Sequence, residues 1–209
     1  MNAYARHSTG GLTLRVGDAE VLCRPSGALW LEAEGALVVA DLHLEKGSAF
    51  AARGPLLPPY DTVHDGGGEE RLCARDTARL NVLAQGRSLI WVLGNHDPGG
   101  PRGLPGESLP GLSLAGLCLV HEPAAGPAPG EVAGHLHPCA RVAGVGGSIR
   151  RRCFVTDGER LILPAFGAYA GGLNVRDLAI RSLLGRVRLA AVLGRDLVHP
   201  VPWKALRGD

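Results

Sequence analysis

The stretch ALVVADLH, residues 36–43, places a run of apolar residues directly before a carboxylate and an imidazole. Val38 to Ala40 have the character of a buried β-strand, and Asp41 and His43 stand two positions apart where that strand would open into a loop. Three later strand candidates end in the same way, in Gly94-Asn95-His96-Asp97, His121 and Gly134-His135-Leu136-His137. Ligands gather beyond the carboxyl ends of strands in open α/β sheets, so we expect these side chains to converge in one cleft.

The side chains at these strand ends are of metal-binding type. Carboxylate, amide oxygen and imidazole nitrogen together suit a borderline divalent ion, such as Mn²⁺, Fe²⁺ or Zn²⁺, better than the all-oxygen site of Ca²⁺. The neighbouring Gly94 and Gly134 would allow the backbone to pass close to such a centre. The pattern therefore predicts a metal site.

The bulk properties fit one globular domain spanning residues 1–209, with 45% apolar and 20% charged residues. No apolar stretch approaches the roughly 20 residues of a membrane helix, and the first residues lack the apolar core of a signal peptide. Five cysteines without a CxxC pair predict reduced thiols rather than a disulfide framework. We therefore expect a cytoplasmic protein that does not engage a membrane.

Charge is distributed unevenly, although the net charge is only +2. Residues 1–125 carry 10 Lys and Arg against 14 Asp and Glu, whereas residues 126–209 carry 12 against 6. The basic half contains the run Arg150-Arg151-Arg152, which is either a solvated surface or a phosphate contact.

Local patterns predict a chain rich in short strands. Hairpins are expected up to residue 40, a loop over 47–68, a helix over Glu69–Gln85 and another loop over Pro98–Gly111. Asp157-Gly158 predicts a tight hairpin between Arg152–Thr156 and Arg160–Leu163. The remaining strand candidates are Leu12–Val16, Glu20–Cys23, Ala28–Glu32, Ala36–Ala40, Leu89–Leu93, Leu117–Val120, Glu131–Ala133 and Val187–Leu193, and Leu178–Leu184 is a second helix candidate.

In order, the strand-end blocks resemble those of the calcineurin-like metallophosphoesterase family, which are DxH, GNH(D or E), a strand-end His and GHxH. Longer segments around these blocks resemble a subgroup of that family, the bacterial ligase-associated DNA damage response endonucleases. These segments are residues 41–62, 94–98, 121–123, 133–138 and 151–175. The family resemblance implies an α/β fold with two β-sheets packed as a sandwich between helices, in four layers α/β/β/α. It also implies a phosphoric ester hydrolase with two divalent metal ions, Mn²⁺ before Fe²⁺ or Zn²⁺. The subgroup implies DNA as substrate and, as possible partners, the ligase and helicase of the same repair cluster.

The resemblance also implies a role for each residue. Asp41, His43 and His137 would bind the first metal, and Asn95, His121 and His135 the second. His96 would donate a proton or hydrogen bond near the leaving oxygen, with Asp97 orienting its imidazole.

One block of the family pattern is missing. Between residues 62 and 63 the expected helix, strand and Gly-Asp are absent, and with them the Asp that bridges both metals in the family. Asp61 or Asp65 could replace that bridge, while His64 is interpreted as a loop residue. The lost strand would leave a gap in a parallel sheet, with unpaired backbone groups.

Three hypotheses of function follow. The first is a phosphodiesterase or endonuclease acting on DNA through a metal-activated hydroxide. The second is a phosphatase or phosphodiesterase for nucleotides or other small molecules. The third, favoured by the missing bridge, is a catalytically impaired module that binds DNA or repair partners. Outside the strand ends, Cys139 is interpreted as a structural thiol rather than a soft ligand, and Phe166 as a packing or groove residue.

Overall fold

The part of the chain that the computed structural model describes comprises residues 4–41, 77–94, 103–144, 147–167, 171–186 and 188–209, with the backbone alone at 63–64, 70–71 and 74–76. None of the helices within these residues has the length and apolar character needed to cross a lipid bilayer.

Of the described strands, seven form a first sheet in the order β1-β2-β3-β4-β5-β8-β9. Its first five strands are antiparallel neighbours, and β5, β8 and β9 run parallel. The strands are β1 Tyr4–Arg6, β2 Leu12–Val16, β3 Ala19–Cys23, β4 Leu29–Leu31, β5 Ala36–Ala40, β8 Ser88–Val92 and β9 Glu107–Leu109.

A second sheet joins nine strands of the described chain in the order β10-β11-β12-β15-β14-β13-β18, with β16 beside β14 and β17 beside β16. In it β11, β12 and β15 are parallel. Its strands are β10 Gly111–Leu114, β11 Leu117–Val120, β12 Glu131–Ala133, β13 Cys139–Gly144, β14 Gly147–Thr156, β15 Leu161–Ile162, β16 Leu189–Leu193, β17 Val198–Pro202 and β18 Leu206–Arg207. The remaining elements are β6 Val63–His64, β7 Glu70–Arg71, α2 Ala74–Ala84, α3 Leu178–Arg181 and the 3₁₀ turn η1 Trp203–Ala205.

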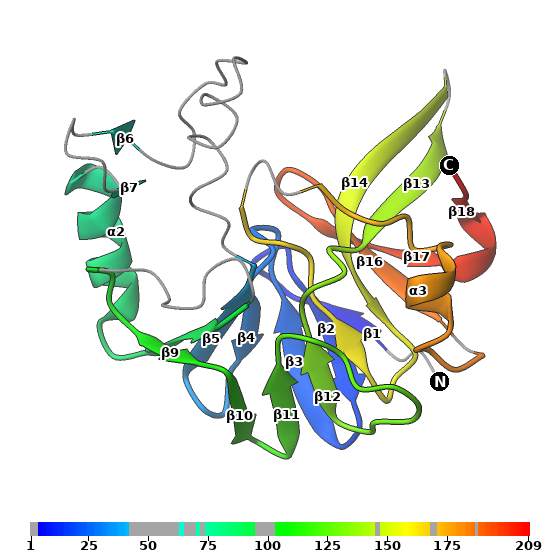
Figure 1. Cartoon of the computed structure of the whole chain (residues 1–209). Helices are drawn as coiled ribbons and strands as arrows, with labels where there is room; N and C mark the ends of the chain where they lie inside the picture. Colours follow the sequence, from blue (N-terminus) through cyan, green and yellow to red (C-terminus); the bar gives the residue numbers. More distant parts are fainter. Residues whose placement is uncertain are drawn as a thin grey trace.

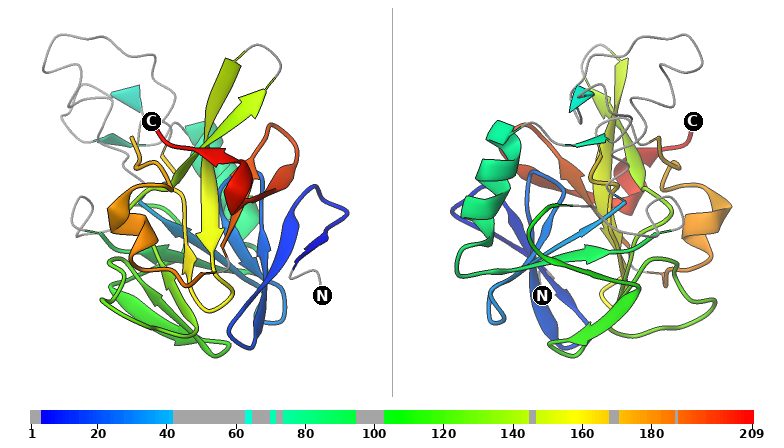
Figure 2. Two further views of the ribbon diagram at one scale, coloured as in Figure 1. Left: turned by 90° about the vertical axis from the view of Figure 1, so that its right-hand side faces the viewer. Right: turned by 60° about the vertical axis from the view of Figure 1, so that its left-hand side comes forward.

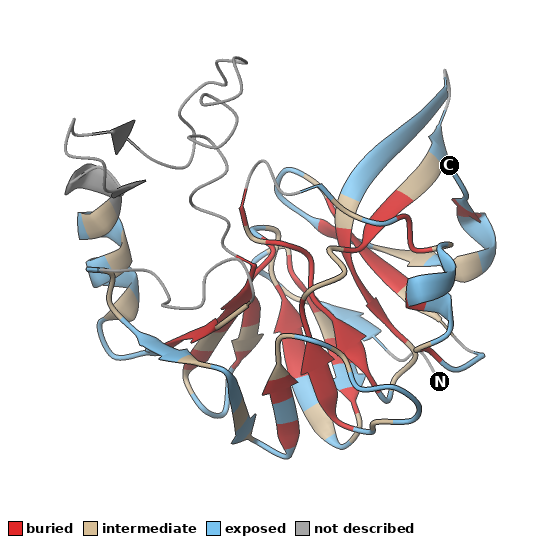
Figure 3. Ribbon diagram, in the orientation of Figure 1, coloured by how far each residue is buried: buried red, intermediate tan, exposed pale blue. Residues whose placement is uncertain are grey.

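In the described chain the two sheets pack face to face, with α2 over the first sheet and α3 over the second, which confirms the predicted four layers (Figures 1 and 2). The largest buried cluster fills the space between the sheets, with Leu14 and Val38 from the first and Leu119 and Phe154 from the second. A second cluster lies between β14, β16 and α3, and a third lies between the outer face of β5 and β8 and Leu80 of α2. Figure 3 shows the buried residues concentrated in these layers.

The predicted gap in the first sheet is wrong for the described residues. β5 pairs directly with β8 along its whole length, from Ala36 beside Ser88 to Ala40 beside Val92. Their backbone groups therefore satisfy one another, and the sheet continues through the position where a strand was expected to be missing.

Three other local predictions need correction. The loop expected over 47–68, with His64 as a loop residue, contains β6, because Val63 and His64 pair with β7. The helix expected over Glu69–Gln85 begins only at Ala74, and its Leu83 is 49% exposed. The loop expected over Pro98–Gly111 contains β9, whose sequence Glu107-Ser108-Leu109 has no apolar alternation. β9 forms because β8 offers it a parallel partner, a tertiary contact that a local pattern cannot reveal.

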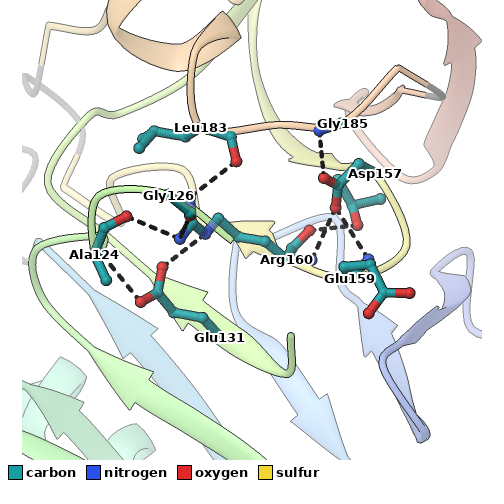
Figure 4. A network of polar contacts seen from close by, with 9 residues as sticks. Ala124, Gly126, Glu131, Asp157, Glu159, Arg160, Leu183 and Gly185 are labelled. Carbon is teal, nitrogen blue, oxygen red and sulfur yellow. Dashed lines mark hydrogen bonds and ion pairs between the residues drawn. The ribbon is translucent and has the colours of Figure 1, made fainter. Parts of the chain in front are cut away.

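A buried ion pair joins the strands of the second sheet to two loops (Figure 4). Arg160 and Glu131 are 1% and 5% exposed, and Arg160 Nε lies 2.7 Å from Glu131 Oε1. The same guanidinium donates hydrogen bonds of 2.8–2.9 Å to the carbonyl oxygens of Leu183, Ala124 and Gly126. Buried charges are tolerated when they are paired and hydrogen-bonded, which is the case here.

Candidate metal centre

Three of the predicted strand-end histidines gather around the carboxylate of a fourth predicted residue, Asp41. Asp41 follows β5 of the first sheet, and its side chain is 2% exposed. Its Oδ1 lies 3.3 Å from His137 Nε2 and 3.4 Å from His121 Nδ1, and its Oδ2 accepts a 2.8 Å hydrogen bond from the backbone N–H of His135. The three histidines follow β11 and β12 of the second sheet. The centre thus lies where the two sheets meet at their strand ends.

The backbone at this centre adopts a conformation that side-chain-bearing residues rarely use. Asp41, His135 and His137 have φ values of 54°, 66° and 46° and account for three of the four non-glycine residues with positive φ in the described chain. Asp and His tolerate this left-handed region better than most residues, yet each instance costs about 1–3 kcal/mol. Such residues persist where the surroundings hold them, and in the described chain three of them cluster at this centre.

Two glycines allow the segments to approach one another. A Cβ on Gly134 would lie 2.5 Å from Asp41 Oδ2 and 2.9 Å from Ala40 Cβ, and a Cβ on Gly94 would lie 2.6 Å from the His121 ring. Real Cβ atoms do not approach other atoms this closely. The close backbone approach expected at Gly94 and Gly134 is therefore present.

His121 and His135 contact each other directly. His135 Nδ1 and His121 Nε2 are 3.1 Å apart, with the ring centroids at 4.9 Å and the planes at 82°. A hydrogen bond between two imidazoles requires one nitrogen to donate and the other to accept, so at most one of these rings carries a positive charge in this arrangement.

The electrostatics lower the pKa of the carboxylate and of one neighbouring imidazole. Burial alone would raise the pKa of Asp41, but the hydrogen bond and charge of His137, the amide of His135 and the charge of His121 together lower it below its usual value. Burial lowers the pKa of His121, partly opposed by the Asp41 carboxylate and reinforced by His135 and His137. An ionised carboxylate beside a neutral imidazole is the protonation state that metal coordination requires.

A support for Asp41 was missed by sequence reasoning. The backbone N–H of Phe166 donates to the carbonyl oxygens of Ala40 and Asp41 at 3.1 Å, and that of Gly167 donates to Asp41 at 3.3 Å. Arg152 Nη1 in turn donates to the carbonyls of Ala165 and Phe166 at 2.8 Å. Arg152 thus binds the backbone of residues 165–167, and this segment in turn hydrogen-bonds to the backbone of Asp41. Arg152 does not lie on a solvated surface. Its position two residues before the buried Phe154, on the same face of the strand, was the available signal.

The other predicted residues have different outcomes. His43, Asn95, His96, Asp97 and Asp61 lie outside the described residues, as does Asp65, and of His64 only the backbone in β6 is described. Cys139 is buried in β13 beside Gly172, and Phe166 packs against the cluster under α2.

The chemistry of the gathered donors, one carboxylate and three imidazoles, fits a borderline divalent ion. Within the described residues, however, no three His, Cys, Asp or Glu side chains are already spaced as a metal-binding group. The described donors hydrogen-bond to one another, and an ion would have to replace some of these contacts.

Comparisons with known proteins identify a similar fold. No family model and no curated protein matches the chain. Among solved structures, it is similar to the Pseudomonas putida nuclease MPE, with 23% sequence identity, a TM-score of 0.56, and coverage of 91% of this chain and 100% of that one. At this identity the likeness establishes a shared two-sheet fold.

Proposed function

We propose that this chain is a metal-dependent phosphoric ester hydrolase that cleaves phosphodiesters of a nucleic acid. The observation that carries the proposal is the convergence of Asp41, His121, His135 and His137 from three strand ends in two sheets. Neighbouring ligand-type side chains on a backbone held in a strained conformation are typical of a functional centre.

The proposed ligand sets follow the family pattern. Asp41 and His137 would hold one ion together with His43, and His121 and His135 would hold a second together with Asn95. Bound divalent ions would neutralise phosphate charge and lower the pKa of a water that attacks phosphorus. Mn²⁺ is the first candidate, and Fe²⁺ or Zn²⁺ would suit the same donors.

The chain's own residues would orient and support the reacting groups. The amide of His135 fixes one oxygen of Asp41, which leaves the other oxygen directed at His137 and His121. We assign to His96, with Asp97 orienting its ring, the donation of a proton to the leaving oxygen. The Arg152-bound segment at 165–167 keeps Asp41 in place from the other side.

The nucleic-acid substrate is supported by the fold shared with a protein described as a nuclease. The subgroup resemblance of the motifs narrows the proposal to DNA repair alongside a ligase and a helicase in the cytoplasm. Hydrolysis of small phosphate esters alone, without action on DNA, is the second candidate, and both share the same centre.

The test combines metal content with hydrolysis. We expect purified protein to bind Mn²⁺ and to hydrolyse bis-p-nitrophenyl phosphate and nick supercoiled DNA. Asp41→Ala and His135→Ala should each lower the rate by more than the roughly 10–100-fold typical for loss of a residue that only supports a metal ligand. His199→Ala, a histidine exposed on β17, is the matched control and should retain activity. A chain that binds no metal and hydrolyses neither substrate would refute the proposal, and if it still bound DNA it would be the impaired module.

A further inference from the structure

The hairpin of β13 and β14 extends past the rest of the second sheet. β14 pairs with β16 only from Cys153 onward, so in the described chain Gly147–Arg152 pair with β13 alone. Figures 1 and 2 show these strands projecting beyond the sandwich. β14 runs antiparallel to β15, which is parallel to β12, so this end of the hairpin is at the carboxyl end of β12, where His135 and His137 lie.

Three arginines stand in a row across this projection. Arg141 of β13 lies opposite Arg150 of β14 on one side and opposite Arg207 of β18 on the other. Directly opposed residues of antiparallel strands share one face. Three adjacent strands span about 10 Å, the axial length over which one strand of duplex DNA carries about three phosphates. We call Arg141, Arg150 and Arg207 the arginine row.

The arginine row lies on the face of the sheet that turns toward the candidate metal centre. Along β14, Arg150 and Arg152 alternate onto the same face as Phe154, whose side chain is buried between the two sheets. Arg151 falls on the opposite face with Cys153, which packs in the cluster under α3. The two faces of one strand therefore offer a test residue and a control residue side by side.

Short contacts connect the arginine row to the centre. The Arg150 guanidinium reaches across to the carbonyl of Gly172. Gly172 lies so close to the carbonyl oxygen of His137 that a Cβ on it would be 2.1 Å away. On the same face of β14, Arg152 holds the 165–167 segment that holds Asp41. Gly172 thus lies between Arg150 of the row and the backbone of His137.

The local charge favours an anion. Arg150 and Arg207 are exposed, and Arg141 is partly exposed. Asp209 lies against the row, with Oδ1 at 4.0 Å from Arg150 Nε, and this oxygen also accepts a hydrogen bond from Asn174. Arg141 is oriented by donating from Nε to Ser148 Oγ at 2.7 Å, and a guanidinium with five donors retains others for phosphate oxygens.

We propose that the arginine row binds the phosphodiester backbone of a nucleic-acid strand and directs it toward the candidate metal centre. This inference rests on the proposed function, because it assigns the surface by which that site receives its substrate. Three arginines aligned on one face, next to the site and over a length that several phosphates occupy, match a polyanionic chain better than a small phosphate ester, which would occupy the centre alone.

The experiment measures the salt dependence of binding in EDTA, with a fluorescein-labelled 20-nucleotide single-stranded DNA as probe. The slope of log K against log [salt] is negative, and removing one arginine–phosphate ion pair lowers its magnitude by about 0.7. Changing Arg141, Arg150 and Arg207 together to Gln should lower the magnitude of the slope by about 2 and weaken binding about 100-fold at 0.1 M salt. Arg150→Gln and Arg207→Gln singly should each lower it by about 0.7, which keeps the test decisive if the triple variant folds poorly.

Arg151→Gln is the matched control, because it removes one exposed arginine from the opposite face of the same strand. Its slope should equal that of the wild type. Equal slopes for all variants, or an equal decrease for Arg151→Gln, would overturn the arginine row as the binding surface. Because binding is measured without metal, the two proposals fail separately. If the protein hydrolyses DNA but its binding does not depend on the arginine row, only the proposed binding surface is refuted. If binding depends on the row but no hydrolysis occurs, only the proposed enzymatic activity is refuted.

Discussion

Replacing Arg160 with Met should destabilise the protein more than any change to an exposed arginine. The guanidinium is 1% exposed and pairs with Glu131 at 2.7 Å while donating to three carbonyl oxygens. Methionine fills similar space but supplies no donor. The Glu131 carboxylate, which is 5% exposed, would then remain buried without its counter-ion.

The magnitude follows from the burial of the pair. Removing one partner of a buried ion pair costs about 3–5 kcal/mol, because an uncompensated charge stays in the interior. For a chain of 209 residues, each kcal/mol lowers the melting temperature by about 2–4 °C, so we expect a decrease of about 6–20 °C. Glu131→Gln keeps an acceptor for the N–H of Ala124, now 3.1 Å from Glu131 Oε2, and removes the buried charge. The double variant should therefore cost less than the sum of the single variants.

Urea unfolding followed by circular dichroism measures these free energies, with Arg151→Met as the control. Arg151 is exposed, and the same substitution there should change stability by less than about 0.5 kcal/mol. A stability of Arg160→Met within about 1 kcal/mol of the wild type would refute the role given to this ion pair, as would additive effects of the two single changes.

Two further predictions concern the metal centre. Gly134→Ala places a Cβ 2.5 Å from Asp41 Oδ2, so it should cost about 1–3 kcal/mol of stability and lower metal affinity measured by titration. Gly171→Ala, whose Cβ meets nothing within 4 Å, should leave both unchanged, and equal effects would contradict the steric explanation. The second prediction concerns pH, with the metal removed by EDTA. The pKa values of His121 and Asp41 are lowered in the folded protein, and such a group contributes stability above its unfolded pKa and loses it as pH falls. The free energy of unfolding should therefore fall with decreasing pH. The decline in unfolding free energy should begin near pH 6.5, the ordinary value for His121, and continue below 3.8, that for Asp41; a flat profile between pH 7 and 5 would contradict it.

Short buried strands were predictable from the sequence because their apolar runs end at recognisable turns. β12 coincides with the predicted Glu131–Ala133, and the hairpin at Asp157-Gly158 closes with Thr156 opposite Leu161. The start of α2 and the existence of β9 were not predictable, since they depend on partners elsewhere in the chain.

The candidate site was predictable as a set of strand-end residues but not as a network. The spacing of the motifs predicted that Asp41, His121, His135 and His137 converge, and the structure places them in contact. The partners of Arg152 were not predictable, because they are backbone carbonyls, which leave no trace in residue identity. The pairing of Arg160 with Glu131 was not predictable either, because charged residues are most often exposed and these two are distant in the sequence.

The contact between Asp41 and His135 also bears on the order in which the molecule assembles. These residues are 94 positions apart and belong to different sheets, so their contact can form only after a long segment of chain has closed on itself. Either sheet could gain its hairpins early from local pairing, yet neither alone would contain the centre. Metal binding would therefore indicate completed folding. A chain whose two sheets had formed without packing together would bind no metal, even if its circular dichroism spectrum resembled that of the native protein.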